Sequence, residues 1–314
     1  MDKDSKIYIA GHNGMVGSSI LRNLKKKGFR NLVIRDSSDL DLTSQSEVNR
    51  FFEIERPDYI FLAAAKVGGI LANDMYKAEF IYENMMIQNN IIHHAYLYNI
   101  KKLLFLGSSC IYPRLSKQPI KEEYLLTGAL EKTNEPYAIA KISGIKMCEA
   151  YRYQYDCNFI SAMPCNLFGK NDNYDLTTSH LIPALLRKFY DAKKNNLSYV
   201  EVWGDGTPRR EFLHVDDCAD ACIFLMLHYN DSSFINIGTG IEHRISEIAE
   251  IIKEKIGFKG IIRFNTEYPN GTERKVMDIT KLHNLGWKHS ISFEEGIDHV
   301  LIDIDSEINK TLKF

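Results

Sequence analysis

The sequence predicts an α/β fold in which a doubly wound parallel sheet is followed by a smaller α/β lobe. In the first half, short apolar runs alternate with stretches of helical periodicity, which is the pattern of units that build parallel sheets. A glycine-rich turn directly follows the first apolar run. After Pro164, loops rich in Asn, Asp, Gly and Pro separate shorter elements, as expected of a lobe that covers the carboxyl ends of the strands.

The individual elements follow from the spacing of apolar residues. Fully apolar or alternating runs predict strands, and apolar residues at helical spacing predict helices. In the first half, strands are expected at 6–10, 31–35, 59–64, 102–106 and 158–163, and helices at 15–27, 44–55 (from a Ser or Thr cap), 78–98 and 137–155. In the second half, strands are expected at 198–203 and 234–238, and helices at 216–227 and 245–256. We therefore predict a first domain over 1–165, to which 207–235 returns, and a substrate lobe over 166–206 and 236–314.

The composition excludes several classes of partner. Hydrophobic residues make up 45% and charged residues 25% of the chain, with a formal net charge of −2, as in ordinary globular proteins. Bulk charge therefore gives no reason to expect a nucleic acid or a membrane surface as a partner. We see no secretory or transit-peptide character, and no apolar run approaches the ~18 residues that span a bilayer. The six cysteines form no CxxC pair, so we expect no metal site and a reducing, cytoplasmic compartment.

The glycine-rich turn predicts a dinucleotide site and a sheet of the Rossmann type. It follows a strand and opens a helix, which is the context that the motif requires. Gly11 and Gly14 allow a tight turn that brings backbone N–H groups to a pyrophosphate, and Gly17 lets the helix pack close to the strand. The positive end of the helix dipole then faces the phosphates. The expected contacts are Gly11, Asn13, Gly14, Met15, Val16 and Gly17.

Two neighbouring residues of opposite charge leave the choice of dinucleotide open. Asp36, at the expected end of the second strand, can accept hydrogen bonds from a ribose 2′-hydroxyl, which favours NAD. Arg35 can pair with a 2′-phosphate, which favours NADP. Asp41 and Leu42 are expected near the adenine, although Asp41 is equally explained as a loop residue, and Ala63, Ala64 and Ala65 are expected near the ribose.

A tyrosine and a lysine four residues apart predict proton transfer. Tyr137 and Lys141 lie on one face of an expected helix. A phenol titrates near pH ~10, and a nearby ammonium is expected to lower that pKa and make Tyr137 a usable acid or base. Lys141 can also hold the nicotinamide ribose. Alone, such a pair is more often a solvated surface pair, but after a dinucleotide motif it indicates an oxidoreductase.

A serine and a cysteine follow the fourth expected strand, whose carboxyl end should face the cofactor. Ser108 can hydrogen-bond a substrate carbonyl and stabilise negative charge as hydride arrives, or it can simply cap a turn. Cys110 faces the same cleft, where an electropositive pocket would favour a thiolate base. A lone cysteine is more often an inert core residue, so spacing supports this role only weakly.

Several blocks of sequence together resemble the GDP-L-fucose synthase family of the extended short-chain dehydrogenase/reductases. The likeness runs over nearly the whole chain, and the blocks at 63–69 and 107–113 are far more specific than the tyrosine–lysine pair. The blocks are Gly11-His12-Asn13-Gly14-Met15-Val16-Gly17, Ala63-Ala64-Ala65-Lys66-Val67-Gly68-Gly69, Gly107-Ser108-Ser109-Cys110-Ile111-Tyr112-Pro113, Asn134-Glu135-Pro136-Tyr137-Ala138-Ile139-Ala140-Lys141 and Arg210-Glu211-Phe212-Leu213-His214-Val215-Asp216-Asp217.

The resemblance implies epimerisation of a GDP-4-keto-6-deoxy-hexose at C3 and C5, followed by reduction of the C4 ketone with NADPH, with NADH possible. It implies Cys110 as the base, His180 as the acid, close also to the cofactor, and Ser108, Tyr137 and Lys141 as the reductase triad. It also implies a homodimer formed by the long helices at 78–98 and 137–155. The implied contacts with the GDP-sugar are Ser108, Ser109, Cys110, Asn166, Lys188, Trp203 and Arg210, with Lys275 and Asp278 as weaker candidates.

Three departures from the family pattern bear on specificity. Asn13 and Ser37 stand where some members have arginines for the 2′-phosphate, which puts the preference for NADPH in doubt. Lys170 ends a block that usually continues with proline, which leaves room for a different 4-keto sugar. Cys165 replaces a residue that is often threonine, a small packing change.

Three alternatives remain open. The chain can be a C4 reductase of another GDP-4-keto sugar, such as a heptose, while a separate enzyme epimerises. A dehydratase or 4-epimerase on the same fold would commonly carry Thr-Asp-Glu in place of Ser108-Ser109-Cys110. A dinucleotide sensor would have no need for Tyr137 and Lys141 together.

Overall fold

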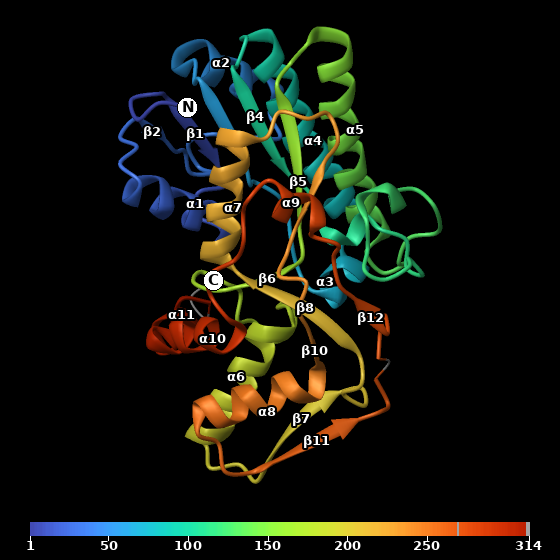
Figure 1. The fold of residues 1–314 in the computed structure, drawn as a ribbon. Coiled ribbons are helices and arrows are strands. Elements are labelled where there is room, and N and C mark those ends of the chain that lie inside the picture. Colours follow the sequence, from blue (N-terminus) through green and yellow to red (C-terminus); the bar gives the residue numbers. More distant parts are fainter. Residues whose placement is uncertain (269, 312–314) are drawn as a thin grey trace.

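A computed structural model describes residues 1–268 and 270–311 and shows the predicted α/β fold (Figure 1). Its main sheet is parallel, with the strand order β2-β1-β3-β4-β5-β9. Consecutive strands are joined by helices that cover both faces, so the strands are mostly apolar and almost entirely buried. The strands are β1 (Ile7–Ala10), β2 (Leu32–Val33), β3 (Tyr59–Leu62), β4 (Lys102–Leu106), β5 (Phe159–Pro164) and β9 (Ile235–Ile237).

Two helix pairs cover this sheet. One pair packs α1 (Met15–Lys26) against α7 (Val215–His228), and the other packs α4 (Lys77–Leu97) against α5 (Glu135–Tyr155) (Figure 1). α2 (Gln45–Glu55) lies beside α4 and begins at Ser44, whose side chain accepts a hydrogen bond from the Glu47 N–H. The expected serine cap is therefore confirmed.

The second half forms a smaller lobe with its own core. β8 (Arg209–His214) is the centre of a small mixed sheet that contains β6 (Asn166–Phe168), β10 (Glu242–Arg244) and β12 (Arg274–Lys275). A parallel pair, β7 (Tyr199–Trp203) and β11 (Ile261–Asn265), lies at the far end. The helices of the lobe are α6 (Leu181–Lys194), α8 (Ile245–Ile256), α10 (Phe293–Ile302) and α11 (Ile304–Thr311), whose apolar sides pack with β7 and β8.

The expected elements are present, but their ends and the small connections differ. The second strand is only two residues long, so Asp36 lies three positions beyond its end rather than at it. The sequence pattern missed β6, β8, β10, β11, β12, α3 (Ile70–Met75), α9 (Thr280–Asn284), α10 and α11, most of which are too short to show a period. The predicted domain boundaries stay a prediction; β8 pairs within the smaller lobe, while α7 and β9 lie with the main sheet.

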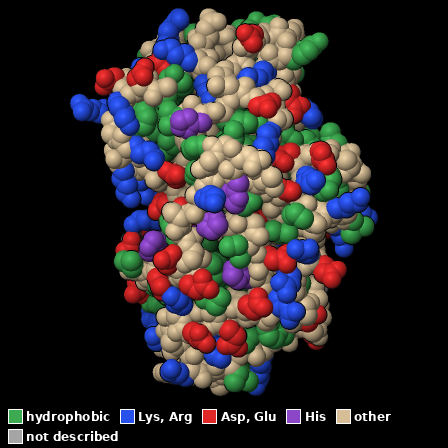
Figure 2. Space-filling model, in the orientation of Figure 1, with side chains coloured by type: hydrophobic (Ala, Val, Ile, Leu, Met, Phe, Trp, Pro, Cys, Tyr) green, Lys and Arg blue, Asp and Glu red, His purple; other side chains and the backbone are tan. Residues whose placement is uncertain are grey.

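On the face seen in Figure 2, acidic and basic side chains are interspersed over both lobes. Within residues 1–268 and 270–311, no helix combines the length and the apolar character that crossing a bilayer requires.

Candidate active site

The glycine-rich turn has the close packing that its sequence predicts. Gly11 has a φ of +84°, and a Cβ there would lie 2.7 Å from the backbone of Ala64. A Cβ on Gly17 would lie 2.1 Å from the carbonyl oxygen of Gly11, so only glycine lets α1 approach the strand this closely. Gly14 caps α1 without a side chain, which leaves the first N–H groups of the helix open to an anion. These features fit the diphosphate of a dinucleotide.

The residues expected at the 2′ position already have partners within the protein. Asp36 accepts a hydrogen bond from Asn13 Nδ2 at 2.5 Å, and its carboxylate lies 3.3 Å from His12 Nε2. Arg35 is an ion-pair partner of Glu55 and donates to the carbonyl of Ile34 at 2.7 Å. In this conformation Asp36, and not Arg35, therefore faces the glycine-rich turn.

The end of β4 brings Ser108 and Cys110 into one short 3-10 turn, η1 (Ser109–Ile111). Ser108 caps the N-terminal end of this turn, and its Oγ accepts a hydrogen bond from the Cys110 N–H at 3.4 Å. Hydrogen bonding with Ser108 lowers the pKa of both the Cys110 thiol and the Tyr137 phenol, so the three groups are neighbours. Ser109, expected to contact substrate, is buried beside them.

Lys141 lies directly below this turn. Its side chain is buried, its Nζ donates to the carbonyl of Leu106 at 2.8 Å, and it lies 5.8 Å from the centre of the Tyr137 ring. Burial lowers the pKa of Lys141 to about 8, against a smaller opposing effect of Cys110. The ring of Tyr137 packs edge-on against Phe80, with centroids 6.1 Å apart.

The expectation that the pKa of the Tyr137 phenol is lowered is wrong for this structure. Burial raises the pKa of Tyr137, and the nearby Cys110 raises it further, against a smaller effect of Ser108. Desolvation wins because the site is enclosed and the ammonium is directed to a backbone carbonyl. Tyr137 is therefore a protonated phenol here, a form that can donate a proton.

Cys110 is buried among cationic groups. Burial raises the pKa of its thiol, while Lys275, Ser108 and Lys141 lower it, in decreasing order. Lys275 belongs to β12, where its backbone is paired with that of Arg210. The electropositive surroundings expected for this thiol are therefore present, although burial still favours the neutral form.

A buried glutamate that sequence reasoning did not single out ties backbone N–H groups of two other segments to β8. Glu211 is fully buried in β8, and its carboxylate accepts the backbone N–H groups of Thr239 at 2.6 Å, Gly240 at 2.7 Å and Met277 at 2.7 Å. Burial raises its pKa to about 7 against these hydrogen bonds. Its presence between two arginines and an apolar run in Arg209-Arg210-Glu211-Phe212-Leu213 was the available signal.

His180 is the N-cap of α6 and is carried by a loop that contacts Gly68 and Gly69. The Gly69 N–H donates to the carbonyl of Thr178 at 2.7 Å, and a Cβ on Gly69 would lie 2.3 Å from the carbonyl oxygen of Ser179. His180 is exposed to solvent over part of its surface. The protein atoms around its ring still desolvate it, and this lowers its pKa.

The residues expected at the nucleotide lie in the smaller lobe. Lys188 Nζ lies 5.0 Å from the centre of the Trp203 ring and donates to the carbonyl of Glu201 at 3.1 Å. Burial lowers the pKa of Lys188 and that of Arg210. Asn166 donates to the carbonyl of Glu211 at 2.9 Å, which holds β6 against β8. Asp278, the weaker candidate, accepts the Thr280 N–H at 2.9 Å and lines a cavity elsewhere.

The departure at Lys170 has a packing explanation. Lys170 pairs with Asp303 at 2.7 Å, and the Asn171 N–H donates to Glu307 at 2.7 Å. Asn171 also donates to the Ser18 hydroxyl on α1 at 2.9 Å. These side chains join the loop to the C-terminal helices, so the expectation that they select the sugar is not supported by their contacts. Cys165 is buried, as expected of a packing change.

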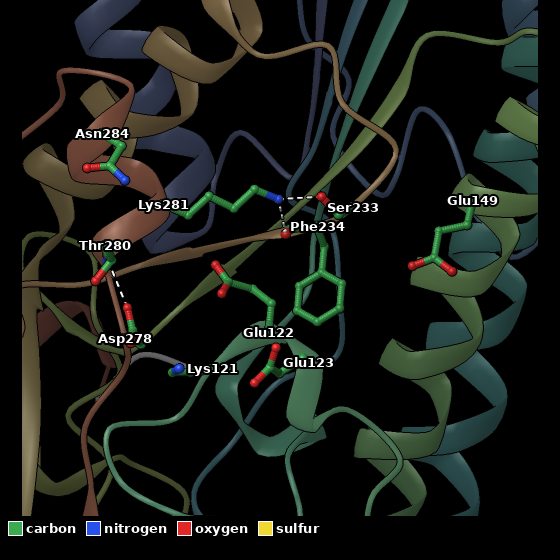
Figure 3. A pocket seen from close by; sticks show the side chains of 10 residues that line it. All are labelled: Lys121, Glu122, Glu123, Glu149, Ser233, Phe234, Asp278, Thr280, Lys281 and Asn284. Carbon is green, nitrogen blue, oxygen red and sulfur yellow. Dashed lines mark hydrogen bonds between the residues drawn. The ribbon is translucent and has the colours of Figure 1, made fainter.

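A cavity of about 670 Å³ opens elsewhere and contains none of the predicted catalytic residues (Figure 3). Lys281 donates across it to the carbonyl of Phe234 at 3.3 Å, and Glu122 accepts the Asn236 N–H at 3.0 Å. Lys281 and Glu122 are thus already paired within the fold, and the site at Tyr137 and Cys110 is the better candidate for chemistry.

Comparison with known proteins gives a consistent picture. A profile of the NAD dependent epimerase/dehydratase family matches residues 7–238. GDP-L-fucose synthase 1 of Arabidopsis thaliana is 54% identical over 296 residues, covering 94% of this chain and 92% of the relative. GDP-L-fucose synthase of Escherichia coli (strain K12) is 52% identical over 301 residues, covering 93% and 94%.

A solved structure extends the likeness to three dimensions. MlghC, a GDP-mannoheptose C4 reductase from Campylobacter jejuni with NADP bound, superposes with a TM-score of 0.89 at 42% identity, covering 97% of this chain and 99% of that one. Sequence, fold and site geometry therefore agree, and the chain belongs to the GDP-L-fucose synthase family, within the NAD dependent epimerase/dehydratase family.

Proposed function

We propose that this chain epimerises a GDP-4-keto-6-deoxy-hexose at C3 and C5 and then reduces its C4 ketone with NADPH. The observation that carries the proposal is the neighbourhood of Ser108, Cys110 and Tyr137 above the buried Lys141. An acid for the ketone oxygen and a thiol for the adjacent carbons thus share one site. The relatives named GDP-L-fucose synthase support the choice of sugar nucleotide.

In the reductive step, the chain supplies a proton; NADPH, when bound, would supply the hydride for C4. Tyr137 donates its phenolic proton to the C4 oxygen, a role that suits a phenol whose pKa is raised. Ser108 donates a hydrogen bond to the same oxygen and stabilises its developing charge. Lys141, fixed by the carbonyl of Leu106, holds positive charge beneath the phenol as the proton leaves.

In the epimerisation steps, the C4 ketone acidifies the protons on C3 and C5. The Cys110 thiolate takes a proton from one face of the sugar carbon, and the electron pair of that C–H bond moves into an enolate. His180 then delivers a proton to the opposite face, which inverts the carbon and leaves the ketone unchanged. Lys275 and Lys141 favour the thiolate, and Ser108 stabilises the enolate oxygen.

The proposed cofactor is NADPH, whose diphosphate would lie at the open N-terminus of α1. The NADP-bound structure of a relative supports this choice. Asp36 then lies near the 2′-phosphate, together with Asn13, which can donate to it. NADH remains the comparison substrate in every assay.

The experiment that tests the function is a panel of GDP-4-keto sugars with NADPH or NADH, followed by NMR of the products. A second candidate is C4 reduction of a GDP-4-keto-heptose, which the likeness to the GDP-mannoheptose C4 reductase favours. Incubation of GDP-4-keto-6-deoxy-mannose in D2O without reduced cofactor separates the two. Deuterium at C3 and C5 supports the epimerase, and its absence at both carbons rules epimerisation of that sugar out.

A homodimer in the cytoplasm is part of the proposal. α4 and α5 pack together and leave apolar side chains such as Tyr82 and Ile139 exposed, which a second copy could cover. The six cysteines are free thiols, as expected in a reducing compartment. Light scattering of the purified protein tests the dimer, and we expect no affinity for nucleic acid or for lipid vesicles.

A further inference from the structure

An exposed pair of stacked aromatic rings lies at the end of the smaller lobe. Trp203, at the end of β7, and Tyr268, in the turn after β11, have centroids 4.3 Å apart and ring planes only 10° from parallel. Both residues remain exposed, at 41% and 42%. Rings at this spacing are in full contact, so a third ring can reach the shared face only if one of the two moves.

The other face of Trp203 is occupied. Since Tyr268 covers one face, the ammonium of Lys188, 5.0 Å from the ring centre, lies over the opposite one. Trp203 itself is fixed by strand pairing, in register with Asn265 of β11. Tyr268 is attached only through a turn, in which its N–H donates to the carbonyl of Asn265 at 3.4 Å. Tyr268 is thus the ring that can move outward.

The segment after Tyr268 connects the aromatic pair to the reaction site. Asn270 accepts the Asp205 N–H at 2.9 Å, and a Cβ on Gly271 would lie 3.6 Å from Nη2 of Arg210. Arg210 pairs through the backbone with Lys275, which acts on Cys110. Among residues 1–268 and 270–311, no carboxylate forms an ion pair with Lys188, Arg210 or Lys275. Uncompensated cations of this kind suit a diphosphate that links a base to a sugar.

We propose that Tyr268 and Trp203 form a clamp for the purine base of the sugar nucleotide, with the base inserted between the rings and Tyr268 covering its outer face. The inference rests on the proposed function and adds a specificity residue, Tyr268, to it. A base inserted between the rings contacts both Trp203 and Tyr268. A base that displaced Tyr268 from the indole would contact Trp203 alone. A purine covers the indole more fully than a pyrimidine does.

Binding of free GDP to the full chain tests the clamp by calorimetry and by tryptophan fluorescence. The only other tryptophan, Trp287, is buried and bonded to Asp220, so quenching by GDP reports on Trp203. Tyr268→Ala should raise the Kd for GDP about tenfold, and Tyr268→Phe should keep it within roughly twofold of wild type, because stacking and not the hydroxyl supplies the contact. UDP should bind more weakly than GDP to wild type, and this difference should shrink in Tyr268→Ala.

Tyr199→Ala is the matched control, since Tyr199 is an exposed aromatic residue at the opposite end of β7 and lies under Arg263. It should leave the Kd for GDP unchanged, and all variants should keep the wild-type Kd for NADPH, which shows that they are folded. Unchanged or tighter GDP binding by Tyr268→Ala overturns the clamp; tighter binding shows that Tyr268 only fills the base site. A wild-type chain that fails to bind GDP contradicts the proposed function instead.

Discussion

Lys141 directs its ammonium to the carbonyl oxygen of Leu106, 2.8 Å away, and lies 5.8 Å from the centre of the Tyr137 ring. The lysine thus acts on the phenol from a fixed position below it rather than through a direct hydrogen bond. Burial raises the pKa of the phenol and lowers that of the ammonium to about 8. The site therefore holds a proton on Tyr137 until a ketone accepts it.

Removal of the Tyr137 hydroxyl should abolish most of the reduction without unfolding the site. In Tyr137→Phe the ring still packs against Phe80, but no acid remains at the ketone oxygen. We expect kcat for NADPH oxidation with a GDP-4-keto sugar to fall by about 10²- to 10⁴-fold, the usual contribution of a positioned acid. The Kd for NADPH should change little. Turnover within threefold of wild type would refute the role of Tyr137, because loss of a positioned acid should lower kcat by about 10²-fold or more.

Replacement of Cys110 should stop epimerisation at C3 and C5 while reduction of the C4 ketone continues. Cys110→Ser keeps a small polar group at the turn but removes the thiol, so C3 and C5 should no longer take up deuterium in D2O. Reduction of the C4 ketone should continue, since Ser108 and Tyr137 remain. Cys157→Ser is the control, because Cys157 is a free thiol that lies outside the site. Unaltered deuterium uptake in Cys110→Ser would mean that another group is the base.

The site was predictable to the extent that it depends on contacts close in sequence. The spacing of Tyr137 and Lys141 and the turn at Ser108 follow from one helix and one strand end, and the structure places them together. The influence of Lys141 on the phenol was not predictable, because burial decides the sign of the pKa shift and burial depends on the whole fold. Glu211 was missed for the same reason: its three backbone donors come from segments distant in sequence.

The ammonium of Lys275 should set the pH at which Cys110 reacts. Burial raises the pKa of the thiol and Lys275 lowers it, so Lys275→Met should move that pKa upward. The rate of alkylation by iodoacetamide, which needs the thiolate, should then reach its midpoint at a higher pH than in wild type. Lys281→Met removes the same charge from the cavity of Figure 3 and should leave the profile unchanged. A profile that does not move in Lys275→Met would show that this lysine does not act on the thiol.

Glu211 should be needed as a carboxylate and not only for its shape. In Glu211→Gln, one end of the side chain becomes a donor, so one of the N–H groups of Thr239, Gly240 and Met277 faces an N–H of the amide. We expect the free energy of unfolding to fall by about 1–3 kcal/mol, the cost of leaving a buried donor unpaired. Urea unfolding measures this change. Glu250→Gln, on the exposed side of α8, is the control and should alter stability by less than about 0.5 kcal/mol.

Asp36 should weaken the preference for NADPH, and Arg35 should contribute little to it. The carboxylate of Asp36 faces the glycine-rich turn beside Asn13, where it repels a 2′-phosphate, whereas Arg35 is held by Glu55. Asp36→Asn should therefore raise the ratio of kcat/KM for NADPH to that for NADH by about five- to tenfold, as one partly screened like-charge pair predicts. Arg35→Ala should change the same ratio by less than about twofold, because breaking an exposed ion pair with Glu55 costs little. A large loss of NADPH selectivity in Arg35→Ala would show instead that Arg35 leaves Glu55 and binds the 2′-phosphate when the cofactor is present.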